Sequence, residues 1–188
     1  MNTNSKSLFD PSILEDYNVW INRLDINHDY PLNDPLYMFI GEYRLLSNFH
    51  ITPVKYEGIT YLSSEHAYQA VKTLDNSMRE MISQATSPSK AKKMGFSVTI
   101  RDNWNTIKYQ IMEDIVRIKF NSNKEIADKL IATGDRYLIE STTWHDCDWG
   151  ICIKKNCEKG CKNKRGKNNL GNILMKIRKE LKDKINYE

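Results

Sequence analysis

The sequence predicts an α+β fold, a mainly helical single domain with short, mostly antiparallel strands. Three observations support this class. Several segments repeat apolar residues every three or four positions, which is the period of an amphipathic helix. The candidate strands are short and do not alternate regularly with the helices, as they would around a parallel sheet. The length of 188 residues is typical of one domain with its own hydrophobic core.

Helices are predicted where apolar residues recur on one face after a capping residue or proline. In chain order they begin at Asp10-Pro11, at Ser64 (to about Asp75, continuing or restarting to Ala85), at Ser87-Pro88 (to Gly95), at Asp102, at Lys124 (to Ala132) and at Asn168 or Asn169. The clearest periodicity follows Asp102, in Trp104, Ile107, Ile111, Ile115 and Ile118.

Short strands are predicted where β-branched and aromatic residues gather between turn signals. They cover residues 37–40, 51–55, 59–62, 137–141 and 151–153. Glu57-Gly58 separates the second strand from the third, and such a pair between two apolar runs predicts a hairpin. A polar connector with two prolines, residues 27–35, precedes the first strand.

The charge is unevenly distributed along the chain. Residues 1–36 form an N-terminal extension with a net charge of −4, of which residues 1–9 are expected to be disordered. Residues 37–188 form the domain, and it contains a basic, cysteine-containing insertion at about 154–167 with a net charge of +6. A solvated loop is the ordinary interpretation of this insertion. The alternative is a contact with nucleic acid through this loop, with an affinity that falls steeply with salt.

No stretch approaches 18 consecutive apolar residues, and the N-terminus lacks the apolar segment of a secretory signal. The sequence therefore predicts an intracellular, cytoplasmic protein without membrane contact. In that setting free thiols are expected, and no metal or cofactor, because the spacing of the four cysteines and a nearby histidine fits the paired ligands of zinc sites only loosely. Zinc remains the alternative for this set, which is His145, Cys147, Cys152, Cys157 and Cys161.

The segment from Ser63 to Lys72 has a divided helical face. Its small and branched apolar residues fall on one side, and the other carries Glu65, Tyr68, Gln69 and Lys72. So sparse and mixed a polar face suggests a ligand-binding wall, although an exposed amphipathic helix is the alternative. Glu65 and Lys72 would be separated by about 10 Å along the axis, so we expect them to converge on a ligand and not to form an ion pair. His66 points off this line and is expected to be structural.

Polar and aromatic loops elsewhere suggest a pocket for a nucleobase and a ribose. They contain Leu45–Phe49, Trp144–Gly150 and Lys167–Gly171. The N-terminus of the last helix, next to the basic insertion, is a predicted phosphate site. No glycine-rich nucleotide-binding loop is present, so an NTPase or a dinucleotide-binding function has no support.

A set of ordered motifs extends from about Tyr37 to Leu181. They are Phe39-x-Gly41-x-Tyr43, Leu46-Ser47-Asn48-Phe49, Ser64-Glu65-His66-Ala67-Tyr68-Gln69-x-x-Lys72, Arg101-x-x-Trp104, Met112, Lys119-Phe120, Leu130-x-x-Thr133-Gly134, Glu140, Trp149-Gly150 and Asn168-Asn169-Leu170-Gly171-x-Ile173-Leu174-Met175-x-Ile177-Arg178. Each block is weak, but the ordered set resembles the YbiA/NADAR family. Residues 1–36 and the insertion lie outside the resemblance.

The resemblance implies an N-glycosidase that hydrolyses a C1′–N bond in a phosphorylated ribose. Family substrates are early riboflavin-pathway intermediates of the 5-amino-6-ribosylaminouracil phosphate type, while relatives remove ADP-ribose from guanine. The implied partner is therefore a small ribosyl-phosphate or ADP-ribosyl substrate. A non-catalytic module that binds ADP-ribose or a nucleotide is the alternative, and the oligomeric state is left open.

Glu65 and Lys72 match the family motif and are the predicted catalytic residues. A carboxylate stabilises the oxocarbenium character that develops at C1′ or transfers a proton, and a neutral lysine can attack C1′ to form a Schiff base. We assign Lys72 as the nucleophile and Glu65 as the acid/base, which requires desolvation to deprotonate the amine. The predicted substrate-binding residues are Asn48, Phe49, Tyr68, Gln69, Trp104, Asp148, Trp149, Asn168 and Asn169.

Overall fold

The computed structural model describes residues 21–24, 34–155, 161 and 166–187. The predicted disorder at 1–9, most of the first predicted helix and most of the connector at 27–35 lie outside these residues. In the part of the chain that is described, no helix is both long and apolar enough to cross a bilayer.

The described chain is mainly helical, with three two-stranded sheets, so the α+β class is confirmed. The helices are the 3₁₀ helix η2 (Gly41–Leu46) and the α-helices α2 (Ser64–Ala70), α3 (Asn76–Ser83), α4 (Pro88–Gly95), α5 (Trp104–Asn121), α6 (Lys124–Ala132) and α7 (Asn169–Tyr187). The strands are β1 (Leu36–Tyr37), β2 (Val54–Tyr56), β3 (Ile59–Tyr61), β4 (Leu138–Ile139), β5 (Ser141–Thr142) and β6 (Ile151–Cys152).

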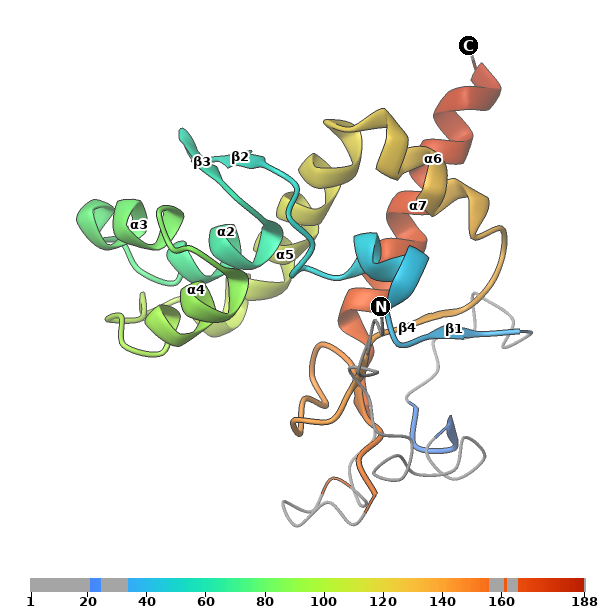
Figure 1. The fold of residues 1–188 in the computed structure, drawn as a ribbon, viewed down its shortest axis with the longest axis horizontal. Helices are drawn as coiled ribbons and strands as arrows, with labels where there is room; N and C mark the ends of the chain where they lie inside the picture. The colour runs from blue at the N-terminus through green and yellow to red at the C-terminus, as the bar shows by residue number, and fades with distance from the viewer. Residues whose placement is uncertain (1–20, 25–33, 156–160, 162–165, 188) are drawn as a thin grey trace, which may run out of the picture.

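Helix α5 is the central element. In Figure 1, α2, α3 and α4 lie on one side of it and α6 and α7 on the other, and α5 contacts members of both groups. Its apolar stripe supplies the buried Ile111, Ile115 and Phe120. Both groups of helices thus pack on one hydrophobic core, as a single domain requires.

The expectation of mostly antiparallel strands is wrong for the described sheets. Only β2 and β3 pair antiparallel, through the predicted hairpin, in which Glu57 and Gly58 both have positive φ. The pairs β1–β4 and β5–β6 are parallel. A turn signal predicts a local hairpin, whereas β1 and β4 are about a hundred residues apart in sequence and no local signal specifies how they pair.

Three predicted boundaries also need correction. The strand expected at 37–40 stops at Tyr37, because Met38 has a positive φ of 57° and the chain turns into η2. The helix expected from 64 to 75 ends at Ala70, and α3 restarts where the Asp75 carboxylate accepts hydrogen bonds from the Ser77 and Met78 amides. Asp102 does not cap α5, whose N-cap residue is Asn103.

Candidate active site

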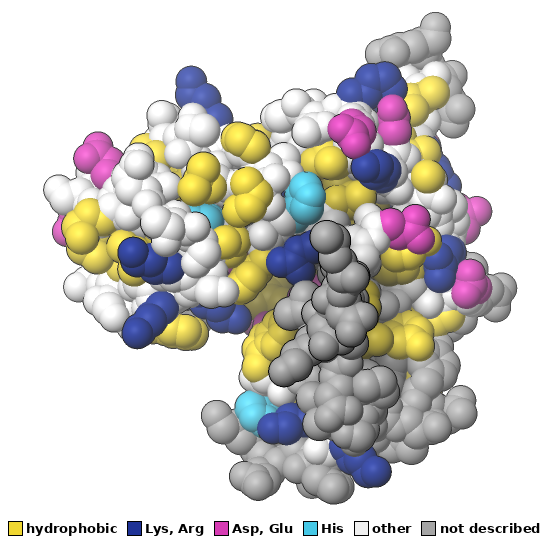
Figure 2. Space-filling model, in the orientation of Figure 1, with side chains coloured by type: hydrophobic (Ala, Val, Ile, Leu, Met, Phe, Trp, Pro, Cys, Tyr) yellow, Lys and Arg dark blue, Asp and Glu magenta, His cyan; other side chains and the backbone are white. Residues whose placement is uncertain are grey.

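A cavity of about 790 Å³ lies between helix α2 and the loop that precedes β6. Its walls come from η2 and the residues after it, from α2, α4 and α5, and from residues 140–149. Figure 2 shows hydrophobic and basic side chains around a hollow between the side that carries α2–α4 and the rest of the molecule. Its volume is typical of a small-molecule site.

The start of α2 is fixed by His66 and Ser63. The Ser63 side chain accepts a hydrogen bond from the His66 amide and lies 2.8 Å from Nδ1 of the imidazole. Nε2 of His66 lies 3.0 Å from the carbonyl oxygen of Ala85, so both ring nitrogens are used inside the protein. His66 is fully buried and does not line the cavity, so it is structural, as expected.

Glu65 lines the cavity from the first turn of α2. Every residue of this helix is buried, so the alternative of an exposed amphipathic helix is excluded. The Glu65 carboxylate accepts a hydrogen bond from Nε2 of Gln69 at 2.7 Å. Burial raises the pKa of Glu65, although the Gln69 hydrogen bond and the nearby charges of Lys92 and Lys72 oppose the shift. The carboxyl therefore stays protonated to a higher pH than an exposed glutamate does, which suits a proton donor.

Lys72 lines the same cavity just after the end of α2. Its Nζ lies 5.7 Å from the centre of the Tyr68 ring and 5.6 Å from that of Phe96. Burial lowers the pKa of Lys72, and the negative charge of Glu65 opposes the shift. Among the described residues, no salt bridge joins Lys72 to Glu65, which agrees with the expectation that they do not pair directly. The axial separation calculated for one continuous helix does not apply, however, because α2 ends before Lys72.

Three predicted aromatic residues form one wall. Tyr68 packs against Trp104 with ring centres 5.1 Å apart and meets Trp149 edge to face at 5.4 Å. Trp104 is 7% exposed, so most of its surface belongs to the core and only a small part faces the cavity. The wall thus offers aromatic surface to a planar ligand.

Asn48 and Phe49 lie on the wall formed by the segment after η2. The Asn48 carbonyl accepts the Glu65 amide at 3.0 Å, which ties this segment to α2. Within the described chain, Oδ1 of Asn48, Oε1 of Gln69 and Oγ of Ser141 are buried at the cavity without a hydrogen-bond partner. Because an unpaired buried polar atom is costly, these atoms are candidates to bind a polar ligand.

Lys119 of α5 holds the segment before Asn48 through two hydrogen bonds. Its side chain is fully buried, and Nζ donates to the carbonyl oxygens of Leu45 at 2.5 Å and Ser47 at 2.9 Å. Burial lowers the pKa of Lys119 to about 7. Lys119 belonged to the ordered motifs but was not predicted as a site residue, although it follows Ile115 by four positions and therefore falls on the apolar stripe of α5.

Two carboxylates at the cavity were not predicted as site residues. Glu140 lies between β4 and β5, and burial raises its pKa to about 8, with the negative charges of Asp146 and Glu65 adding to the shift. Asp146 also lines the cavity, and its Oδ1 accepts the amides of Asp148 and Trp149. Glu140 stood in the ordered motifs, which was the available signal; nothing in the sequence separated Asp146 from Asp148.

Three cations that line the cavity were also missed, namely Arg44, Lys92 and Lys108, of which Lys108 pairs with Asp148. Arg44 is exposed at the rim, and Lys92 of α4 lies over the rings of Phe49 and Trp144 at 5.7 and 5.4 Å. Neither forms a salt bridge with a described residue. Arg44 directly precedes the predicted pocket loop Leu45–Phe49, which was the available signal, whereas Lys92 is identified only by its proximity in the fold.

The structure leaves three predicted binding residues outside the cavity, namely Asp148, Asn168 and Asn169. Asp148 instead forms ion pairs with Lys108 and Lys167, both at 2.9 Å. The Asn168 side chain accepts from the Glu140 amide and donates to the Leu138 carbonyl. Asn169 donates to the Asp148 carbonyl at 2.8 Å. These residues position the cavity wall and do not face the cavity.

The start of α7 does not offer the free amides that the predicted phosphate site requires. The amides of Asn169 and Leu170 donate to the carbonyls of Asp148 and Trp149 at 3.4 and 3.0 Å. The amide of Asn172 donates to the Asn168 carbonyl. These amides are therefore used within the protein, and the cations that face the cavity lie elsewhere.

The NADAR domain family matches residues 38–182 of this chain. N-glycosidase YbiA of Shigella flexneri serotype 5b is 38% identical over 147 residues, which cover 77% of this chain and 86% of the relative. A riboflavin biosynthesis protein of Vibrio vulnificus is 32% identical over 160 residues, covering 83% of this chain and 41% of that protein. The NMR structure of Escherichia coli YbiA is similar with a TM-score of 0.70 and 32% identity, covering 88% of this chain and 96% of the other.

Proposed function

This chain belongs to the NADAR domain family and is a hydrolase acting on N-glycosyl bonds, and we propose that its substrates are early riboflavin-pathway intermediates. These are pyrimidines joined through an exocyclic nitrogen to C1′ of ribose phosphate, of the 5-amino-6-ribosylaminouracil phosphate type. The similarity to a riboflavin biosynthesis protein supports this substrate class. The catalytic assignment rests mainly on one observation: Glu65 and Lys72 line one cavity, and burial shifts their pKa values toward each other.

The opposite shifts suit the two roles. A lowered pKa increases the fraction of Lys72 that is a neutral, nucleophilic amine near pH 7. A raised pKa increases the fraction of Glu65 that is protonated and able to donate to a leaving nitrogen. An ion pair would instead hold both groups charged, and none joins them among the described residues.

The reaction would proceed in two stages. Nζ of Lys72 attacks C1′ while the C1′–N bond breaks, and the leaving nitrogen takes the electron pair and a proton from Glu65. The Glu65 carboxylate then takes a proton from the Lys72 nitrogen and passes it to the ring oxygen, so that the sugar ring opens and the Lys72–C1′ bond becomes a protonated imine. Water adds to this imine, and its hydrolysis releases the ribose phosphate and regenerates the amine.

The other residues at the cavity would bind and stabilise the substrate. The rings of Tyr68, Trp104 and Trp149 would contact the pyrimidine. Arg44 and Lys92 would attract the phosphate, because neither is neutralised by a described carboxylate.

A product assay tests this function. Purified protein is incubated with the riboflavin-pathway intermediate or with an ADP-ribosylated guanine oligonucleotide, and released base and sugar are quantified. We expect release of the pyrimidine, and a loss of at least about 100-fold in kcat/KM in both Lys72→Ala and Glu65→Gln. Lys179→Ala, which replaces an exposed lysine of α7 that does not line the cavity, is the matched control and should keep full turnover. Full turnover by Lys72→Ala would refute the assignment of the nucleophile.

The second candidate is ADP-ribosylated guanine. The cavity volume of about 790 Å³ and two of its cations, Arg44 and Lys92, favour this candidate, since a diphosphate-linked substrate is larger and more anionic. Release of ADP-ribose from the oligonucleotide, without turnover of the pyrimidine substrate, would identify this activity instead. Binding of both ligands without product from either would indicate a non-catalytic module.

A further inference from the structure

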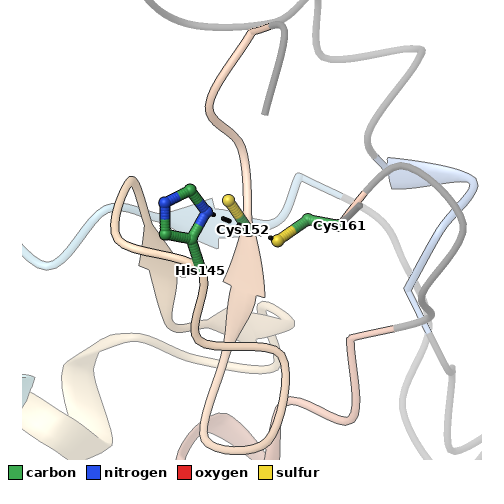
Figure 3. Close-up of side chains that lie close together, drawn as sticks. All are labelled: His145, Cys152 and Cys161. Atoms are coloured by element: carbon green, nitrogen blue, oxygen red, sulfur yellow. Dashed lines mark hydrogen bonds between the residues drawn. The ribbon is translucent and has the colours of Figure 1, made fainter. Parts of the chain in front are cut away.

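Three metal-ligating side chains converge outside the cavity. His145 lies on the loop before β6, Cys152 ends β6, and Cys161 belongs to the basic insertion. Figure 3 shows the three side chains pointing toward one another from these separate segments. Their ligand atoms all lie within 4.8 Å of one another. We propose that His145, Cys152 and Cys161 bind a structural zinc ion that fastens the basic insertion to the domain.

The distance between two of the ligand atoms agrees with tetrahedral zinc. With Zn–S of about 2.3 Å and Zn–N of about 2.0–2.1 Å, a tetrahedral site separates a sulfur from a nitrogen by about 3.6 Å. Sγ of Cys161 lies 3.6 Å from Nδ1 of His145. A thiol–imidazole hydrogen bond can have the same length, and the metal content of the protein distinguishes the two.

The composition of the insertion supplies an independent argument. Between Lys154 and Lys167 the only apolar residues are Cys157 and Cys161. Such a segment cannot bury enough apolar surface to offset its conformational entropy. Cys161 is nevertheless only 3% exposed, and Cys152 only 2%. Metal binding provides the folding free energy that the insertion lacks in hydrophobic residues.

Cys147 is the candidate fourth ligand, although its sulfur is not among the three ligand atoms that converge. It is partly buried and packs against Cys152 and Cys161, on the same loop as His145. A fourth protein ligand would close the coordination shell, as is usual for structural zinc. Cys157 lies outside the described residues.

The ion would also fix one wall of the cavity. The ligand His145 stands between Trp144 and Asp146, both of which line the cavity. The Cys147 carbonyl accepts the Lys167 amide at 3.1 Å, which connects this loop to the end of the insertion. A zinc ion would therefore join β6, the insertion and the loop that carries the cavity residues Asp146 and Trp149.

Metal analysis of the full-length chain tests the proposal. The protein is produced without a histidine tag in zinc-supplemented medium, kept reduced and passed over a desalting column, and its zinc is measured by mass spectrometry. We expect one zinc ion per chain, and at least a tenfold loss of bound zinc in His145→Gln, Cys152→Ser and Cys161→Ser. His50→Gln, which removes a half-buried histidine outside the cluster, is the matched control and should retain the metal.

A measurement without substitutions covers the case in which a buried variant fails to fold. Co²⁺ added to the metal-free wild-type chain should produce the absorption of tetrahedral cobalt with thiolate-to-metal charge transfer. The proposal would be overturned by wild-type protein that binds neither Zn²⁺ nor Co²⁺ while its thiols are reduced. It would be overturned equally by full zinc retention in Cys152→Ser and Cys161→Ser, or by a disulfide joining these two cysteines in the native chain.

Discussion

Glu140 should destabilise the folded protein near neutral pH. Burial, together with the carboxylates of Asp146 and Glu65, raises its pKa from 4.5 to about 8. Between these two pH values the folded state binds more protons than the unfolded state. Stability therefore falls as the pH rises through this window. Glu140→Gln keeps the shape of the side chain, removes the titration and should stabilise the protein.

The size of the effect follows from the shift. Each pH unit within the window contributes about 1.4 kcal/mol, and pH 7 lies about 2.5 units above the start of the window, so the cost at pH 7 is about 3 kcal/mol. The cavity is open to solvent and Glu140 is partly accessible, which screens the charge. We therefore expect Glu140→Gln to raise the free energy of unfolding by about 1–3 kcal/mol at pH 7, and by almost nothing near pH 4.

Urea denaturation at pH 4.5, 6, 7 and 8.5 measures this difference. Glu125→Gln on α6 is the matched control, because that carboxylate is 77% exposed and, among the described residues, pairs with Lys129 alone across one helical turn. Its free energy of unfolding should stay within about 0.5 kcal/mol of the wild-type value at neutral pH. If the stability of Glu140→Gln follows that of the wild type in parallel at every pH, the buried-carboxyl reasoning is wrong.

Three further outcomes are expected. Lys119→Met should lower the free energy of unfolding by about 1–3 kcal/mol and raise KM, because the carbonyls of Leu45 and Ser47 lose their buried donor; urea denaturation and steady-state kinetics measure both. Burial favours a higher pKa for Asp148, but hydrogen bonds from Lys108, Lys167 and Tyr109 outweigh it and lower this pKa. Asp148→Asn should therefore lower the free energy of unfolding by about 1 kcal/mol at pH 7 and leave it unchanged in acid, as measured by denaturation at several pH values. A zinc chelator should lower the Tm by several degrees in thermal scans, and excess Zn²⁺ should restore it.

Local signals in the sequence predicted the local structure well. Helix α4 begins and ends where Ser87-Pro88 and Gly95 indicated, and the Ser87 side chain accepts the Lys90 amide. The hairpin around Glu57-Gly58 also forms as expected. In both cases the determining interactions lie within a few residues of one another, so the sequence alone contains them.

Long-range features could not be predicted in the same way. The parallel pairing of β1 with β4 depends on how the whole chain folds between them. Asn168 has the side chain of a helix cap, but it bonds to Glu140 and Leu138 from another part of the chain. Capping propensity describes only local competition for hydrogen bonds, and here a tertiary contact uses the same side chain.

The cavity was predicted in outline and corrected in detail. The α2 motif placed Glu65, Tyr68, Gln69 and Lys72 on one wall, and the structure brings all four to the cavity. Asp146 lines the cavity in place of the predicted Asp148, because the loop turns between them and Asp148 forms ion pairs with two lysines. A shift of two residues within an irregular loop leaves no periodic trace in the sequence.

The most direct test of the account is to trap the covalent intermediate on Lys72. The protein is incubated with the riboflavin-pathway intermediate and sodium borohydride, digested and mapped by mass spectrometry. We expect a reduced ribose-phosphate adduct on Lys72, no adduct in Lys72→Ala, and an undiminished adduct in the control Lys179→Ala. Full turnover without an adduct on Lys72, or an adduct on Lys92 in its place, would contradict the proposed mechanism.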